Sequence, residues 1–387
     1  MKLNILSGLS FLFVASLFSC NNAKQTASQE ETSALRINQI QVIGSHNSYK
    51  PQIEPPLMEM ILAEDSNAIA LDYRHVSLSE QLDLGLRKVE IDVLYDPQGG
   101  RFAKPMGLKL LQEKGIEPLP FDTDGKLNAP GFKVLHIPDI DFRTSCYTLA
   151  SCLEELKQWS AAHPKHLPIA ISFNAKTGEV EREGFAEMLP FTKAAYDSLD
   201  AEILSVLPAD KIIRPDDVRG DYATLEEAVL NNNWPLIEDA RGKFMFVLDE
   251  GTEKSKPYID GHPSLKDRVM FVKVEPGKPE AGFVFMNDPV NYKDSIKALV
   301  AMGYIVRTRA DANTTEAREG DYSRFEDALE SGAQFISTDY YLPDERLGTG
   351  FQIKMPDGVI SRCNPINTKD NCKPDLLEPI DDHAKVE

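Results

Sequence analysis

The chain has 387 residues, of which 42% are hydrophobic and 27% are charged, a composition typical of a globular protein and not of a disordered one. This length suits one large α/β domain or two smaller ones. The formal net charge of −19 argues against a nucleic-acid partner and against adhesion to anionic lipid by bulk charge, because both of those surfaces attract basic proteins.

The N-terminus has the pattern of a targeting segment. Lys2 is followed by an apolar run over residues 5–18. The run ends in the stretch Leu17-Phe18-Ser19-Cys20. The run is too short for a comfortable transmembrane helix. It resembles a bacterial lipoprotein signal over residues 1–19 that leaves a lipidated Cys20; a plain secretory signal is the alternative. We expect residues 20–34 to be a flexible tether and the protein to be exported and lipid-anchored in the bacterial cell envelope, on its periplasmic or outer-membrane face.

The other four cysteines fit an exported protein. Cys146 and Cys152 are six residues apart, and Cys363 and Cys372 are nine apart. Close pairs in an exported chain predict two local disulfides, with four free thiols as the alternative. A zinc site is a poor interpretation, because no C-x-x-C or histidine pair accompanies them.

Beyond the tether, short apolar segments alternate with amphipathic ones. Eight segments have the length and composition of strands, at residues 37–43, 87–93, 133–136, 167–173, 243–248, 269–274, 304–307 and 334–337. Helical patterns lie between them at residues 78–86, 148–162, 185–206, 224–231, 292–302 and 322–331. Such alternation predicts a (β/α)8 TIM-type barrel as a single domain over residues 35–387. An open doubly wound sheet is the runner-up, weakened because no Gly-x-Gly-x-x-Gly follows the first strand.

Chemically useful residues fall at the ends of the first two strands. His46 and Asn47 follow the first, and Glu90 and Asp92 lie on one face of the second because strand side chains alternate. Two inward carboxylates repel each other unless a cation neutralises them, so a hard divalent ion held by Glu90, Asp92 and Asn47 is the natural remedy. The plainer alternative is a capping turn together with a solvent-facing acidic pair on an edge strand.

His136 ends the third predicted strand and adds a second imidazole. A histidine in that position is often a satisfied core residue. Beside His46 and a carboxylate pair, however, it suits phosphodiester cleavage, in which one imidazole withdraws a proton and the other protonates the leaving alkoxide. A metal there would neutralise phosphate charge.

The chain resembles bacterial calcium-dependent phosphoinositide-type phospholipases C, within the barrel superfamily of phospholipases C and glycerophosphodiester phosphodiesterases. The matching stretches run in order from about residue 39 to 365: Gly44-Ser-His-Asn-Ser-Tyr49, Tyr73-Arg-His-x-x-Leu78-Ser-Glu-Gln-Leu82, Glu90-Ile-Asp92, Gly131-Phe-Lys-Val-Leu-His-Ile-Pro-Asp139, Arg307-Thr-Arg-Ala-Asp311, Ser337-Thr-Asp-Tyr340 and Arg362-Cys-Asn-Pro365. The resemblance implies His46 and His136 as the catalytic pair, Asn47, Glu90 and Asp92 as metal ligands, and Ca2+ as the cofactor.

The fourth strand departs from the family pattern. The family usually carries Glu-x-Lys there, whereas this chain has Asn174 and Lys176. Asn174 still offers an oxygen to the metal but no charge, so we expect weaker binding, and Lys176 is available to a phosphate oxygen. Asp249 and Arg307, at the ends of two later strands, are further candidates for binding substrate; a surface turn and an ion pair are their plainer roles.

These observations predict a metal-assisted phosphodiesterase that cleaves a phospholipid head group. One alternative is a glycerophosphodiester phosphodiesterase, in which water and not a substrate hydroxyl is the nucleophile. A second is a non-catalytic envelope lipoprotein that binds lipids or inositol phosphates, favoured by Asn174 and disfavoured by the two histidines. We expect a monomer that meets its membrane through Cys20.

Overall fold

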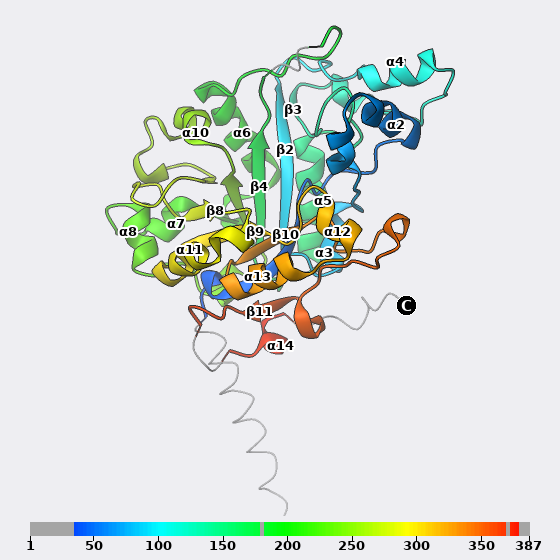
Figure 1. Ribbon diagram of the computed structural model, residues 1–387. Helices are drawn as coiled ribbons and strands as arrows, with labels where there is room; N and C mark the ends of the chain where they lie inside the picture. The colour runs from blue at the N-terminus through cyan, green and yellow to red at the C-terminus, as the bar shows by residue number, and fades with distance from the viewer. Residues whose placement is uncertain (1–34, 179–181, 369–371, 379–387) are drawn as a thin grey trace, which may run out of the picture.

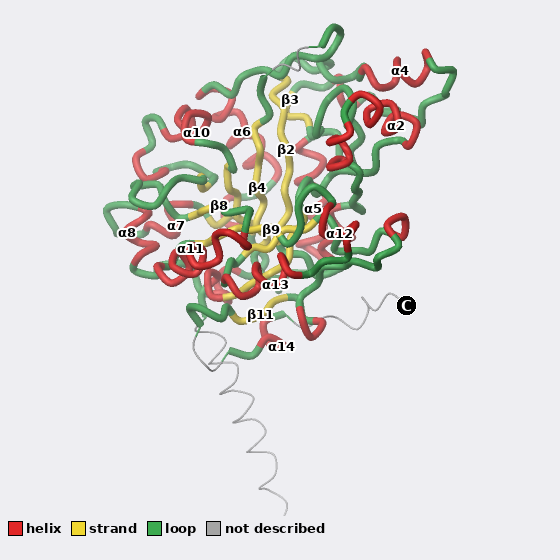
Figure 2. The backbone as a smooth tube through the Cα atoms, in the orientation of Figure 1, coloured by secondary structure: helices red, strands yellow, loops and turns green. Residues whose placement is uncertain are grey.

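The computed structural model describes residues 35–178, 182–368 and 372–378, and the predicted signal and tether lie outside these ranges. Parallel strands form the centre of the molecule and helices surround them (Figures 1 and 2). The barrel strands are β1 Ile40–Ser45, β2 Lys88–Asp96, β4 Ile169–Ala175, β6 Phe244–Leu248, β7 Phe271–Val272, β8 Phe283–Phe285, β9 Ile305–Arg309 and β10 Phe335–Thr338.

The order of these strands closes a ring. Hydrogen bonds join β8, β9, β10, β1, β2, β4 and β6 in that order, β7 pairs with β6, and one parallel bridge between Lys273 and Phe283 joins β7 to β8. All of these pairings are parallel. The predicted eight-stranded TIM-type barrel is thereby confirmed.

In the described ranges, three strands lie outside the ring: β3 Gly131–Lys133, β5 Ile212–Ile213 and β11 Ser361–Cys363. The prediction that residues 133–136 form the third barrel strand is wrong, because β3 runs antiparallel to the far end of β2 and pairs with no other barrel strand. The eighth barrel strand is instead β8, which the sequence analysis missed; β7 is shorter still, but it lies within the longer apolar segment predicted at residues 269–274.

The helices are α2 Pro55–Glu64, α3 Leu78–Asp83, α4 Met106–Glu113, α5 Leu149–Ala162, α6 Lys193–Val206, α7 Pro215–Arg219, α8 Leu225–Leu230, α9 Ile237–Ala240, α10 Thr252–Ile259, α11 Pro289–Met302, α12 Thr315–Glu319, α13 Ser323–Ser331 and α14 Pro374–Leu377. The helix predicted from residue 185 begins only at Lys193, where the side chain of Thr192 caps it. No helix in the described ranges has the length and apolar character needed to cross a membrane.

The two faces of β2 show how the sequence places the site. Val89, Ile91 and Val93 face outward and are fully buried in the largest apolar cluster, which also contains Leu153 and Leu156 of α5. The alternating residues of β2 then face the barrel interior. β2 is paired on both sides, and its carboxylates are at most 2% exposed, which excludes an acidic pair on a solvent-facing edge strand.

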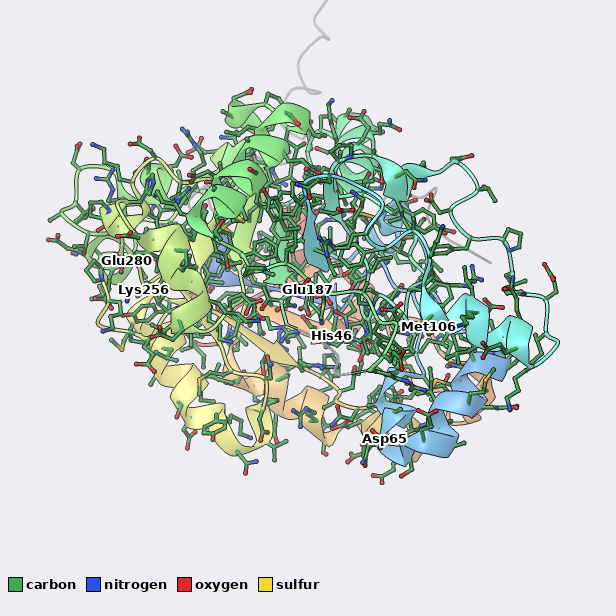
Figure 3. All side chains as sticks on the ribbon, turned by 90° about the horizontal axis from the view of Figure 1, so that it is seen from above. His46, Asp65, Met106, Glu187, Lys256 and Glu280 are labelled. Atoms are coloured by element: carbon green, nitrogen blue, oxygen red, sulfur yellow. A yellow bond between two sulfur atoms is a disulfide. The ribbon has the colours of Figure 1, made fainter. Side chains whose placement is uncertain are left out.

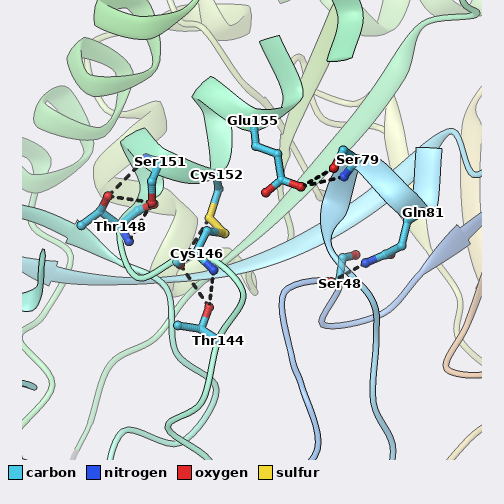
Figure 4. The surroundings of a disulfide bond; sticks show 9 residues. All are labelled: Ser48, Ser79, Gln81, Thr144, Cys146, Thr148, Ser151, Cys152 and Glu155. Atoms are coloured by element: carbon cyan, nitrogen blue, oxygen red, sulfur yellow. Dashed lines mark hydrogen bonds between the residues drawn. A yellow bond between two sulfur atoms is a disulfide. The ribbon is translucent and has the colours of Figure 1, made fainter. Parts of the chain in front are cut away.

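Two disulfides tie segments to this frame, as the cysteine spacing predicted. Cys146–Cys152 joins the loop after β3 to the first turn of α5 (Figure 4). Cys363–Cys372 joins β11 to the segment that precedes α14. Both fit an exported protein.

Candidate functional site

His46 stands directly after β1, at the carboxyl ends of the barrel strands. Its Nδ1 lies 2.9 Å from Oδ1 of Asp339, which follows β10 and also receives a 2.7 Å hydrogen bond from Arg309. Burial and the charge of Arg309 lower the pKa of His46, although the charges of Asp339 and Glu90 oppose this. The imidazole is therefore neutral near pH 7, with Nδ1–H directed at the carboxylate and Nε2 able to accept a proton.

His75 helps to hold His46 in place through a contact with its backbone. Its Nε2 donates to the backbone carbonyl of His46 at 2.7 Å, and its ring stacks on Tyr341 with the centroids 5.3 Å apart. Burial lowers the pKa of His75 to about 4, so this donor is the neutral imidazole. The contact fixes the turn on which His46 stands.

Asn47 adopts a left-handed backbone conformation at φ 48°, which an asparagine tolerates better than most residues. Its side-chain amide donates to the hydroxyl of Tyr73 at 2.7 Å, and it is 3% exposed. Within the described part of the chain, its amide oxygen accepts no hydrogen bond, which leaves that oxygen for a cation.

Glu90 lies inside the barrel in a dense set of charges. Its Oε2 accepts hydrogen bonds from Lys88 at 2.7 Å and Arg307 at 2.9 Å, whereas Oε1 accepts one from Asn174 at 3.2 Å and lies 3.7 Å from Nε2 of His46. Burial alone would raise the pKa of Glu90, but the charges of Lys88 and Arg307 outweigh it and hold that pKa well below its usual range. Glu90 is therefore a carboxylate.

Asp92 is the contrasting carboxylate of the same strand. Both of its oxygens are buried and neither has a hydrogen-bond partner among the described residues. The ammonium of Lys176 is 3.2 Å from Oδ2, close enough for an ion pair but not directed as a hydrogen bond. The hydroxyl of Tyr49 is buried beside Asp92 without a hydrogen bond of standard geometry, and burial, followed by the charge and closeness of the Asp92 carboxylate, raises the pKa of Tyr49 well above the usual value. Buried oxygens without partners are costly, so this position fits a bound cation.

The donors near Asp92 suit calcium in type. Asn47, Glu90, Asp92 and Asn174 offer carboxylate and amide oxygens, which hard cations prefer. No group of three or more His, Cys, Asp or Glu side chains in the described ranges is arranged to hold a metal, and this set has only two carboxylates, Glu90 and Asp92. Pairing of Asp92 with Asn174 across β2 and β4 confirms that the two residues lie side by side.

His136 is held by a carboxylate in the same way as His46. Its Nδ1 lies 2.7 Å from Oδ2 of Asp141, which is fully buried and is also 3.4 Å from the ammonium of Lys50. The His136 side chain is 15% exposed, so Nε2 is the ring atom left for exchange with a substrate. Asp141 belongs to the loop after β3 and lies outside the barrel strands.

Contacts between rings and charges connect the two histidines. The ammonium of Lys50, next to Asp141, lies 4.5 Å from the ring centroid of Tyr73, whose ring is 5.9 Å from that of His46. His46 is near the middle of the molecule when it is viewed from above, with the α2–α4 lobe to one side, marked by Asp65 and Met106 (Figure 3). Both histidines therefore belong to one end of the barrel.

The remaining predicted residues are engaged in ion pairs. Asp249 follows β6 and lies 3.0 Å from the ammonium of Lys273. Arg307, 2% exposed, donates to Glu90, Ser337 and Asn287. These contacts favour an electrostatic role for Arg307 inside the barrel over direct contact with substrate.

A comparison with protein families identifies the chain. Residues 35–365 match the family described as "Phosphoinositide phospholipase C, Ca2+-dependent". The chain belongs to this family. The resemblance inferred from the ordered motifs is confirmed, and with it the class of enzyme, a phosphoric diester hydrolase of a calcium-dependent family.

Two solved structures of one bacterial phospholipase C share the fold. A calcium-dependent phosphoinositol-specific phospholipase C from Pseudomonas sp. in its myoinositol complex is 17% identical, with a TM-score of 0.52 over 86% of this chain and 96% of that one. A second crystal structure of the Pseudomonas enzyme is 18% identical with a TM-score of 0.53, over 86% and 97%. The Streptomyces antibioticus enzyme is 18% identical with a TM-score of 0.47, over 84% and 100%. A search of curated proteins found no match.

The sequence analysis missed the partners of the phospholipase C site. Asp339 lay within the quoted Ser337-Thr-Asp-Tyr340 stretch without a role, and Asp141 lay just beyond the stretch that contains His136. Lys88 could have been found, because it is two residues before Glu90 and alternation places it on the same inward face. Nothing local to the sequence indicated that Tyr73 would bond to Asn47.

Proposed function

We propose that the protein cleaves the phosphodiester bond of a phosphoinositide-type lipid head group, with His46 and His136 as a general acid–base pair. The observation that supports this most is the matched anchoring of the two rings. Each Nδ1 lies against a buried carboxylate, Asp339 or Asp141, which leaves each Nε2 for proton transfer.

The reaction needs one group that accepts a proton and one that donates it. The substrate 2-hydroxyl loses its proton to one imidazole and attacks phosphorus, and the other imidazole protonates the leaving glycerol oxygen as its bond to phosphorus breaks. The product is a cyclic phosphate. The lowered pKa of His46 suits the accepting role.

The calcium site assigned here is also part of the proposal. Asn47, Glu90, Asp92 and Asn174 would hold the ion, and the partnerless oxygens of Asp92 support this. Bound calcium would supply positive charge to the phosphate. Lys176 stands beside Asp92 and adds a cation to the same end of the barrel.

A test of products separates this function from its alternatives. Phosphorus NMR after incubation with phosphatidylinositol and calcium should show a cyclic inositol phosphate. A phosphate monoester formed directly from glycerophosphoinositol would instead establish the glycerophosphodiester phosphodiesterase. Binding without turnover of either substrate would favour the non-catalytic lipoprotein. The relative crystallised with myoinositol supports the choice of an inositol head group.

We also propose that the protein is exported and anchored in the bacterial cell envelope, because both disulfides fit an exported protein. Cys20 itself lies outside the described residues. Replacing Cys20 with Ser should move the protein from the membrane fraction to the soluble fraction. An unchanged distribution between these fractions would contradict anchoring through Cys20.

A further inference from the structure

A buried lysine lies next to the proposed metal site. Lys88 begins β2, is 1% exposed, and points to the barrel interior as Glu90 does. Its aliphatic stem runs against Gly44 of β1, where a Cβ would lie 2.6 Å from the Lys88 Cβ and 2.8 Å from its Cδ. Glycine at position 44 therefore leaves room for this side chain between two adjacent barrel strands.

The ammonium of Lys88 has few partners. It donates to Oε2 of Glu90 at 2.7 Å and to the backbone carbonyl of Ser45 at 3.3 Å. Because the ammonium is buried, water does not solvate its charge. Glu90 is its single anionic partner within 4 Å in the described ranges. Any cation that binds Glu90 must share that carboxylate with Lys88.

The charges around the two carboxylates are unequal in number. Lys88 and Arg307 both pair with Glu90, and Lys176 pairs with Asp92, so three cations face two carboxylates before a metal arrives. Calcium would add two further positive charges at short range. Repulsion between like charges in a buried site is weakly screened, so each fixed cation lowers the affinity for the ion.

We propose that Lys88 is an internal competitor of calcium: it occupies Oε2 of Glu90, and its charge sets the calcium affinity of the enzyme. This inference rests on the proposed calcium site at Asn47, Glu90 and Asp92. Lys88 is a positioning residue, because it acts through Glu90 and does not touch the reacting atoms.

Lys88 suits this role better than the other cation on Glu90. The guanidinium of Arg307 has partners of its own in Ser337 and Asn287, so removing it would leave several polar groups unpaired. Removing Lys88 leaves Glu90 still paired with Arg307. A methionine at position 88 has a similar length without the charge, and the barrel should accept it.

The test is titration calorimetry with calcium chloride on the enzyme and on variants, without lipid. Lys88→Met should bind calcium about 10-fold more tightly or better, because a fixed positive charge has been removed from beside Glu90, a proposed ligand of the ion. Lys88→Gln, which keeps a hydrogen-bond donor without the charge, should show a similar gain and guards against a packing effect of methionine. Melting temperatures measured in a chelator report whether each variant folds.

A matched control is Lys133→Met. Lys133 lies on β3, is equally buried, and pairs with Asp96 at the end of β2. In the described ranges it has no contact with Glu90 or Asp92. Its removal should leave calcium affinity unchanged. Asp92→Asn should weaken calcium binding at least 10-fold and tests the site itself, because it removes one of two carboxylates.

The outcomes separate the two proposals. If Asp92→Asn weakens binding while folded Lys88→Met and Lys88→Gln bind calcium no more tightly than the unaltered enzyme, the role of Lys88 is overturned and the calcium site stands. If Asp92→Asn has no effect on calcium binding, the proposed site is wrong and the inference about Lys88 falls with it. Equal tightening by Lys133→Met would show a general charge effect and would also overturn the inference.

Discussion

The two histidines of the site are held alike at the ring and differently at the backbone. His46 follows a barrel strand, and its neighbours bond to strands on both sides: His46 N donates to Thr338 O at 3.3 Å and Ser48 N to Glu90 O at 2.8 Å. His136 follows a short strand outside the barrel. Its loop is held by a bond from Ser145 N to Tyr49 O at 2.8 Å and by a disulfide to α5.

In the proposed reaction, the two rings would therefore depend on two kinds of structural support. The His46 half is built into the hydrogen-bonded sheet and carries the proposed metal ligands, so its geometry is set by the fold. The His136 half depends on a loop with its own carboxylate and its own covalent link. Perturbations should therefore separate the halves, and the predictions below run from the largest expected effect to the smallest.

Loss of either ring should remove the reaction. His46→Ala and His136→Ala should each lower kcat on phosphatidylinositol about 10²-fold or more, because general acid–base groups contribute on that scale. Far-ultraviolet circular dichroism and the melting temperature should stay close to those of the unaltered enzyme. Near-normal turnover in one variant would break the symmetry between the two rings and remove that histidine from catalysis.

The carboxylates behind the rings should be separable by pH. Asp339→Asn should lower kcat/KM about 10-fold and shift its acid limb to lower pH, because the Asp339 charge raises the pKa of His46 and its loss lets that pKa fall further. The control is Asp141→Asn, which should lower activity without moving that limb, since Asp141 does not contact His46. An acid limb that moves equally in both variants, or in neither, would contradict this assignment.

A new carboxylate should act only on the barrel half. Asn174→Glu adds a third carboxylate to Glu90 and Asp92, at the position from which Asn174 now donates to Glu90 at 3.2 Å, and should tighten calcium binding about 10-fold by adding a full charge near the ion. Lys176, which pairs with Asp92, partly offsets the gain. Calorimetry checks this, and equal or weaker affinity would place residue 174 outside the metal shell.

The disulfide should matter to the loop half. Cys146→Ser combined with Cys152→Ser should lower stability by about 2 kcal/mol, as loop-closure entropy predicts for a short loop, and should lower kcat several-fold with calcium affinity unchanged. The matched control is the Cys363→Ser, Cys372→Ser pair, which removes the other disulfide, at β11 and away from His136, and should leave kcat unchanged. A comparable loss of kcat from both pairs would mean that the effect is one of general stability.

Much of the barrel half could be predicted from the sequence, because its signals are local. Apolar runs such as Phe244–Leu248 predict buried strands, and alternation on β2 places Glu90 and Asp92 on one face. The loop half could not be placed as well. Residues near His136 have the composition of a strand, but their pairing with the end of β2 depends on contacts far along the chain.

Partner choice lies beyond a local pattern for the same reason. Asp339 is 293 residues from His46 and becomes its partner only when β10 lies next to β1. Strand β8 was missed because three residues are too few to show an alternating pattern in the sequence. Its pairing with β9 is what identifies it as a strand. The inward position of Lys88, by contrast, could be predicted from alternation along β2. Only its ion pair with Glu90 required the structure.

The excess of cations around Glu90 and Asp92 has a consequence for the order of events at a lipid surface. A phosphate brings negative charge next to the three cations that pair with Glu90 and Asp92, so phosphate and calcium should each raise the affinity for the other, by the same factor in both directions. The free enzyme would then hold calcium weakly and take it up together with the head group. With no head group in the site, the enzyme would be largely free of calcium, and binding of the head group would itself complete the site.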